Sequence, residues 1–162
     1  MGAITREKAI EIAEALKNQG KKIVLANGVF DLLHKGHIIY LKESKSLGDV
    51  LFVAVNSDAS VRKIKGEKRP IQDEQERLLI VSSIRWVDYA FLFEEVNVEK
   101  VLLELRPHFH AKGGDYTPET VPEKKIAESI GAKTIIAGKE KLNSTTDIIS
   151  HILEKYDCHK DK

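Results

Sequence analysis

The stretch IVLANGVFDLLHKGH, residues 23–37, joins an apolar run to two histidines that flank a glycine. Its first four residues form a short apolar run that is bounded by lysines and by Asn27-Gly28, which predicts a central strand covered on both faces. We expect a helix from about residue 36 to residue 47, with Gly48 at its end. A buried strand that leads directly into a helix indicates an α/β sheet.

Strands and helices alternate along the rest of the chain. We expect further strands at residues 50–55, 89–93, 109–111 and 133–137, and further helices at 5–19, 73–83, 97–105, 122–130 and from about 144 to 153. Residues 57–72 read as a solvated polar loop, and residues 157–162 as a polar tail. The alternation predicts a single Rossmann-like, doubly wound α/β domain over residues 1–162, with a central parallel sheet of about five strands flanked by helices.

Composition limits the classes of partner and the compartment. Lysine plus arginine number 26 and aspartate plus glutamate 25, so the net charge of +1 indicates neither nucleic acid nor membrane binding. No apolar segment is long enough to span a bilayer, and the first residues do not resemble a signal peptide. The single cysteine, Cys158, excludes an intrachain disulfide and fits a reducing compartment, so we expect a cytoplasmic protein.

Four unusual segments follow predicted strands: residues 28–37, 57–70, 112–116 and, after a longer connection, 144–146. In a doubly wound sheet, ligands bind outside the carboxyl ends of the strands, near the point where the strand order reverses. We therefore expect one crevice to collect all four segments.

The histidines of the opening stretch allow three interpretations. As a metal site, His34 and His37 are too few, because zinc takes three or four protein ligands and no Cys or His cluster accompanies them, so we expect no metal ligand in the chain. As a structural feature, the pair could cap a helix and face water. As a phosphate site, the pair would add imidazoles to the free N–H groups and positive dipole of a helix N-terminus, and Gly36 would let the phosphate approach closely.

The other three segments are each open to a plain and a functional interpretation. Five basic residues between positions 62 and 69 could be only solvated, or could close over a polyphosphate with Gly66 as a hinge. The segment KGGD, residues 112–115, could be a turn or could let a flat base lie against the backbone. Residues 144–146, Ser-Thr-Thr, could cap a helix or bind phosphate. Without a Walker or dinucleotide-binding glycine motif, the residues favour an α/β enzyme that handles phosphates or nucleotides by another route.

The order of these segments resembles a known family. The pattern G-x-FD-x-x-H-x-GH of residues 28–37 is similar to the HxGH signature of the nucleotidyltransferase superfamily that includes cytidylyltransferases, and residues 144–146 resemble its second signature. Over about residues 5–152, the chain looks most like the adenylyltransferase domains of ADP-heptose synthases. The resemblance implies transfer of AMP from ATP to D-glycero-β-D-manno-heptose 1-phosphate, with Mg²⁺, a separate heptose kinase to supply the acceptor, and a homodimer.

The resemblance also implies roles for particular residues. In-line transfer depends on positioning and charge compensation, which would fall to the catalytic residues His34, His37, Lys65 and Arg77, the last acting on the triphosphate. The acceptor would contact Asp31, Lys112 and Tyr116. The residues implied for nucleotide and phosphate binding are Asn27, Gly28, Phe30, Asp31, Gly36, Gly113, Asp115, Ser144, Thr145 and Thr146.

Some positions depart from the pattern of the family. Pro122-Glu123 replaces a segment of small residues near the acceptor side, which bears on the identity of the sugar, and His108 and His110 have no implied role. Two other functions stay open. One is a cytidylyltransferase that acts on glycerol 3-phosphate or a related alcohol phosphate, and the other is a nucleotide-binding module without catalysis.

Overall fold

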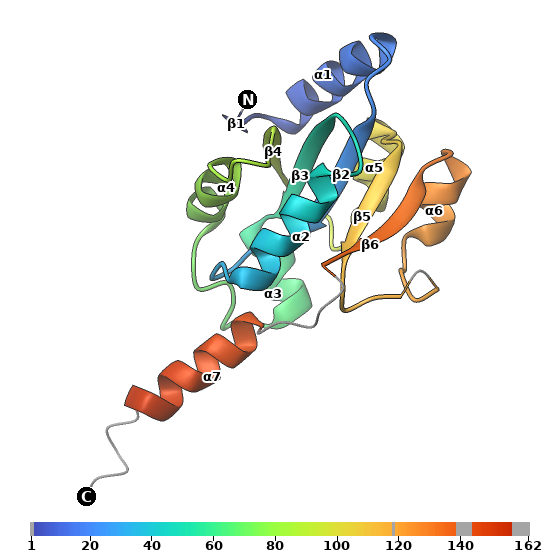
Figure 1. Cartoon of the computed structure of the whole chain (residues 1–162). Helices are drawn as coiled ribbons and strands as arrows, with labels where there is room; N and C mark the ends of the chain where they lie inside the picture. The colour runs from blue at the N-terminus through green and yellow to red at the C-terminus, as the bar shows by residue number, and fades with distance from the viewer. Residues whose placement is uncertain (1, 118, 139–143, 157–162) are drawn as a thin grey trace, which may run out of the picture.

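The computed structural model describes residues 2–117, 119–138 and 144–156. It has a parallel sheet of six strands in the order β1-β4-β3-β2-β5-β6 (Figure 1). The strands are β1 (Gly2–Ala3), β2 (Ile23–Gly28), β3 (Val50–Asn56), β4 (Tyr89–Phe93), β5 (Phe109–Gly113) and β6 (Lys133–Ala137). The helices are α1 (Arg6–Asn18), α2 (Lys35–Lys45), α3 (Asp58–Lys65), α4 (Glu74–Ser82), α5 (Glu99–Leu105), α6 (Lys124–Ser129) and α7 (Thr145–Tyr156).

The predicted doubly wound α/β fold is confirmed, with one strand more than expected. Strand β1 has only two residues, too few to show a pattern, and it pairs with β4 at the edge of the sheet. The predicted tail at 157–162, which contains Cys158, lies outside the described residues. None of the helices in the described part of the chain combines the length and apolar character needed to cross a bilayer.

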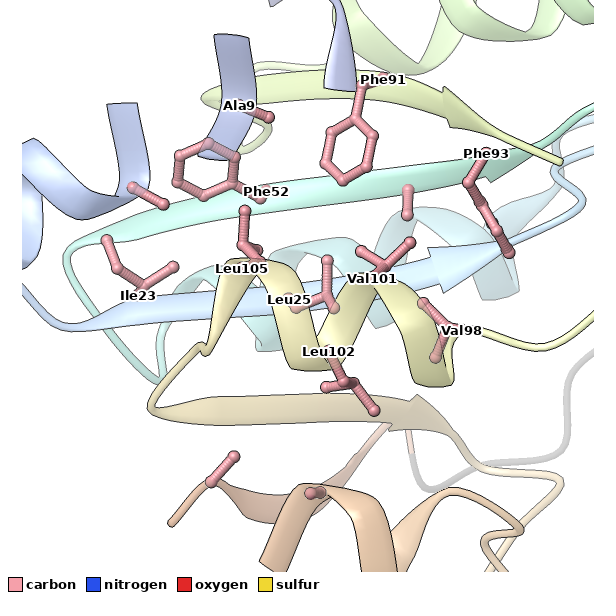
Figure 2. Packing of buried hydrophobic residues seen from close by; sticks show 14 residues of the cluster. Ala9, Ile23, Leu25, Phe52, Phe91, Phe93, Val98, Val101, Leu102 and Leu105 are labelled. Atoms are coloured by element: carbon pink, nitrogen blue, oxygen red, sulfur yellow. The ribbon is translucent and has the colours of Figure 1, made fainter. Parts of the chain in front are cut away.

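The sheet has a hydrophobic core on each face because alternate residues of a strand point to opposite sides. On one face, β2, β3 and β4 pack against α1, α5 and α6 through residues such as Leu25, Phe52 and Leu102 (Figure 2). On the other face, residues such as Val24 and Val53 pack against α2 and α4. With helices on both sides, the central strands are apolar throughout, as the opening stretch predicts.

Side-chain caps define several helix ends, and one predicted loop is wrong. The hydroxyl of Thr5 accepts a hydrogen bond from the N–H of Lys8, as expected for the first helix. Residues 58–65, predicted as loop, form α3, which the hydroxyl of Ser57 caps. Only Ser60 and Val61 of α3 are buried, so the helix leaves almost no apolar pattern in the sequence.

The strand order reverses between β2 and β5, which pair with each other although they lie far apart in sequence. Helix α2 spans this point, and the hydroxyl of Tyr40 donates a hydrogen bond of 2.8 Å to the carbonyl oxygen of Ala111 on β5. Helix α7 begins near the carboxyl ends of the strands and extends away from the sheet (Figure 1). The geometry leaves an opening beyond the carboxyl ends of β2 and β5, where ligands bind in such folds.

Candidate active site

A cavity of about 630 Å³ lies at the carboxyl ends of the central strands. All four segments singled out in the sequence contribute to its wall, which also includes Arg69, one of the five basic residues, and Glu123, from the segment that departs from the family pattern. Arg77 is the one predicted site residue that is not on the wall. The predicted residues that line the cavity are Asn27, Gly28, Phe30, Asp31, His34, Gly36, His37, Lys65, Lys112, Gly113, Asp115, Tyr116, Ser144, Thr145 and Thr146.

The two histidines cap the helix that they begin. The Nδ1 atom of His34 accepts a hydrogen bond of 3.1 Å from the N–H of Gly36, and the Nδ1 atom of His37 accepts one of 3.4 Å from the N–H of His34. A nitrogen that accepts a hydrogen bond carries no proton, so each ring is neutral and bears its proton on Nε2. The ring centroids lie 3.9 Å apart.

Burial reinforces the neutral state of both rings. It lowers the pKa of His37 to about 4, with a further contribution from the neighbouring His34. Burial also lowers the pKa of His34, although the carboxylates of Asp147 and Asp115 act in the opposite direction. At neutral pH the cavity therefore receives two N–H donors and no positive charge from this pair. The cap interpretation is confirmed, and it is compatible with the phosphate interpretation because it uses the other nitrogen of each ring.

Asp31, in the histidine segment, forms hydrogen bonds with the segment that follows α3, residues 66–72, which is called the basic loop below. Its carboxylate, in a residue only 1% exposed, accepts hydrogen bonds from Arg69 Nε at 2.6 Å and from the backbone N–H groups of Ile71 and Gln72. Burial would raise the pKa of Asp31, but these donors together hold it below its usual value. Both carboxylate oxygens are therefore occupied by the protein, although the residue borders the cavity as predicted.

Two residues, Lys65 at the end of α3 and Arg69 in the basic loop, bring positive charge to the cavity. Lys65 ends α3 and is exposed, and Arg69 lies partly buried on the wall. Within the part of the chain that the structure describes, neither Nη atom of Arg69 has a hydrogen-bond partner, because Asp31 engages only Nε. Two N–H edges of a permanent cation are thus available on the wall.

Arg77 lies beneath the cavity. It is completely buried on α4 and donates hydrogen bonds of 2.7 Å to the carbonyl oxygens of Val29 and Asn56, of 2.7 Å to the carboxylate of Asp58 and of 3.0 Å to the carbonyl oxygen of Gln72. The predicted direct action on a triphosphate does not fit this position. The guanidinium instead holds together the segments that follow β2 and β3.

A buried polar cluster at the carboxyl end of β5 contributes further residues to the cavity wall. Lys112, at the end of β5, lies 3.3 Å from a carboxylate oxygen of Glu123, and its ammonium nitrogen lies 4.7 Å from the ring centroid of Tyr116. Two residues before Lys112 on β5, His110 is fully buried, with its Nε2 atom 3.2 Å from Asn27 Oδ1. Burial lowers the pKa of His110 to about 3, so the neutral ring orients the Asn27 amide that lines the cavity.

The start of α7 closes the cavity from a third side. The hydroxyl of Ser144 donates a hydrogen bond of 2.8 Å to Asp147, whose carboxylate also accepts from the Ser144 N–H. The hydroxyl of Thr145 donates to the carbonyl oxygen of Asp31. The second signature therefore caps its helix and is joined directly to the first.

Comparison with known proteins agrees with these features. The family model described as cytidylyltransferase-like matches residues 25–160. Two proteins named bifunctional protein HldE are similar over most of the chain: the one from Pelobacter propionicus is 46% identical over 93% of this chain and 31% of its own length, and the one from Geobacter metallireducens is 49% identical over 90% and 30%. The chain thus spans about a third of the length of these relatives.

Two solved structures resemble the fold. A lipopolysaccharide core biosynthesis protein from Thermoplasma volcanium superposes with a TM-score of 0.64 at 37% identity, covering 76% of this chain and all of the other. The pantoate-β-alanine ligase of Francisella tularensis, solved with a nucleotide and β-alanine, superposes with a TM-score of 0.59 at 19% identity over 96% of this chain and 78% of its own. At that identity the ligase supports the fold alone.

Proposed function

Because the chain belongs to the cytidylyltransferase-like family of nucleotidyltransferases, we propose that it transfers AMP from ATP to D-glycero-β-D-manno-heptose 1-phosphate, giving ADP-heptose and pyrophosphate. The choice of acceptor follows the resemblance to ADP-heptose synthases, and it is supported by the similarity to a protein described as acting in lipopolysaccharide core biosynthesis. The proposed unit is the whole chain of residues 1–162, acting as a single catalytic domain.

The observation that carries the proposal is the histidine pair on the first turn of α2. Each imidazole uses Nδ1 to cap the helix, which leaves an Nε2–H donor at a site that also has the positive end of a helix dipole. Phosphate oxygens that gain negative charge during transfer are stabilised by such preorganised donors. His34 and His37 therefore suit a reaction at phosphorus in which no protein nucleophile takes part.

The reaction that we propose is an in-line displacement. An oxygen of the sugar phosphate forms a bond to the α-phosphorus of ATP while the bond from that phosphorus to the bridging oxygen of pyrophosphate breaks, and the leaving pyrophosphate keeps the electron pair. The neutral imidazoles donate hydrogen bonds to the phosphoryl oxygens. Lys65 and Arg69 supply the positive charge that compensates the triphosphate, and Gly36 allows close approach to the backbone.

ATP is ordinarily used with Mg²⁺ in such reactions, but the described residues provide no set of side chains to bind the ion. No group of three or more His, Cys, Asp or Glu side chains in the described residues could hold a metal ion. The carboxylate of Asp31 is occupied by Arg69 and two backbone donors. Any Mg²⁺ would thus be bound mainly by phosphate oxygens of the nucleotide, and the roles given above to the side chains do not depend on it.

The proposal extends to partners. Its acceptor carries phosphate on the anomeric carbon, so a kinase must act first, and we expect a separate heptose kinase. A homodimer and a cytoplasmic location complete the proposal, the latter supported by the single cysteine of the chain.

Pyrophosphate release tests the function. The wild-type chain is assayed with ATP or CTP against the heptose 1-phosphate, other sugar 1-phosphates and glycerol 3-phosphate, beside the variant His37→Ala. We expect release with ATP and the heptose phosphate, and a loss of turnover of several orders of magnitude in the variant. Release only with CTP and glycerol 3-phosphate would replace the proposal by a cytidylyltransferase. Nucleotide binding without release under any condition would favour a module without catalysis.

A further inference from the structure

The cavity wall at the carboxyl end of β5 contains a buried ion pair with long nitrogen–oxygen distances. Lys112 and Glu123 are 7% and 4% exposed, and both border the cavity. Their closest distances are 3.3 Å and 3.5 Å from the ammonium nitrogen to the two carboxylate oxygens. Charged hydrogen bonds between nitrogen and oxygen are ordinarily 2.7–2.9 Å long. The two charges therefore lie close together but do not form a short hydrogen bond with each other.

Hydrogen-bonding capacity is left over on both partners. The Oε2 atom of Glu123 is buried and lies 3.3 Å from the ammonium nitrogen of Lys112, but in the described part of the structure it accepts no hydrogen bond of acceptable geometry. The ammonium of Lys112 has three N–H groups, and the one hydrogen bond that it donates to a described residue is the 3.5 Å bond to Glu123. Buried polar groups are nearly always hydrogen-bonded, and an unsatisfied one is costly. This arrangement suits a ligand that both donates and accepts.

Adjacent hydroxyl groups meet that requirement. One hydroxyl can donate to the carboxylate of Glu123 while its neighbour accepts from the ammonium of Lys112. A phosphate group cannot, because its charge repels the carboxylate. The ring of Tyr116, 37% exposed and 4.7 Å from the ammonium, adds an apolar face against which the C–H groups of a sugar ring can lie.

We propose that Glu123 and Lys112 together bind a pair of adjacent hydroxyls on a sugar ring, with Glu123 as the specificity-determining residue. The inference rests on the proposed function, since both substrates of that reaction carry such a diol: the ribose of the nucleotide and the ring of the acceptor. The shared chemistry is the diol, and the experiment below separates its two sources.

The experiment compares Glu123→Gln with the wild type in steady-state pyrophosphate release. The nucleotides are ATP, 2′-deoxy-ATP and 3′-deoxy-ATP, and the acceptors are the heptose 1-phosphate and analogues that each lack one ring hydroxyl. Glu128→Gln is the matched control, because Glu128 lies on α6, the helix that begins directly after Glu123, is exposed and lies 3.9 Å from Lys124. Thermal unfolding of each variant verifies that it folds.

Hydrogen bonds to charged groups support an effect on the order of 10- to 100-fold. In the wild type, the KM of the deoxy form of one substrate is expected to exceed that of the parent substrate by this factor. In Glu123→Gln, the KM of the parent substrate is expected to rise by the same factor, so that parent and deoxy forms have equal KM values. A change confined to ATP assigns the diol to ribose, and a change confined to the acceptor assigns it to the sugar. Glu128→Gln is expected to keep wild-type values.

Two results would overturn the inference: unchanged KM values in Glu123→Gln, or an equal rise for parent and deoxy substrates, which is the mark of a purely structural role. If Glu123→Gln does not fold, equal KM values of the wild type for parent and deoxy substrates would also overturn the inference. Calorimetric titration of the wild type with ATP, the heptose phosphate and their deoxy forms needs no turnover. It therefore decides the inference even where no pyrophosphate is released and the proposed function fails.

Discussion

Replacing Arg77 by methionine tests whether this residue supports the cavity or acts in it. Methionine keeps the apolar part of the side chain and removes the guanidinium, so the carbonyl oxygens of Val29 and Asn56 lose their 2.7 Å donor. Each unsatisfied buried acceptor costs about 1–3 kcal/mol. The carboxylate of Asp58 is 23% exposed and can be rehydrated, so loss of its ion pair adds only about 1 kcal/mol. Together these losses should lower the free energy of unfolding by about 3–7 kcal/mol.

Urea unfolding measures the loss of stability, and pyrophosphate release measures the effect of the substitution on turnover. With a urea slope of about 2 kcal/mol per molar, the midpoint should fall by roughly 1.5–3.5 M. Where Arg77→Met is still folded, its turnover should fall by less than about tenfold, far less than in His37→Ala. Arg85→Met is the control, because Arg85 is exposed just beyond the C-terminal end of α4 and does not line the cavity. A stability within about 1 kcal/mol of wild type, with turnover reduced more than 100-fold, would refute the supporting role and restore direct action on the triphosphate.

Three further outcomes are expected. The pKa of His37 is about 4 in the folded protein and 6.5 in the unfolded chain, so the unfolded chain binds more protons between these pH values. The contribution of the neutral His37 ring to the free energy of unfolding is therefore complete above pH 6.5 and is lost as the pH falls towards 4. This should remove about 2 kcal/mol between pH 7 and pH 5 in urea unfolding, and His37→Gln should lack that part of the slope. Gly48→Ala would place a methyl group 2.8 Å from the carbonyl oxygen of Lys22, so we expect a loss of about 1–3 kcal/mol, and an unchanged melting temperature would contradict this packing. Asp31→Asn weakens the hydrogen-bonded ion pair with Arg69 and should raise the KM for ATP about tenfold through looser phosphate binding; a wild-type KM would show that phosphate binding does not depend on this pair.

The strands could be predicted from sequence because burial on both faces requires apolar residues at consecutive positions. β4 and β6 have the predicted bounds, and β2, β3 and β5 extend the predicted ranges by one or two residues at their carboxyl ends. Those added residues, such as Asn27 and Gly113, lie where the strands meet the cavity and the apolar requirement ends. The site segments could be predicted for the same reason, since unusual residues after a buried strand converge on one edge of the sheet.

Other features depend on three-dimensional contacts that leave no local pattern. The sequence places Arg77 on a helix but does not show that its side chain points beneath the cavity. Glu123 belongs to no motif, and its importance arises only because α6 brings it to Lys112, eleven positions away in the sequence. The basic loop shows a run of charges, yet which of them is held and which is available depends on the tie between Asp31 and Arg69.

The capping role of the histidines restricts what evolution or design could place there. Serine, asparagine or aspartate would cap α2 equally well, but none would present a second donor on the far side of a rigid ring. Lysine or arginine would bring donors to the phosphate, but neither could accept from the backbone. Asparagine and serine also combine an acceptor with a donor, but on a short side chain, whereas imidazole in its Nε2–H form places the two on opposite edges of a rigid ring. Positions 34 and 37 should therefore tolerate fewer substitutions than either role alone would require.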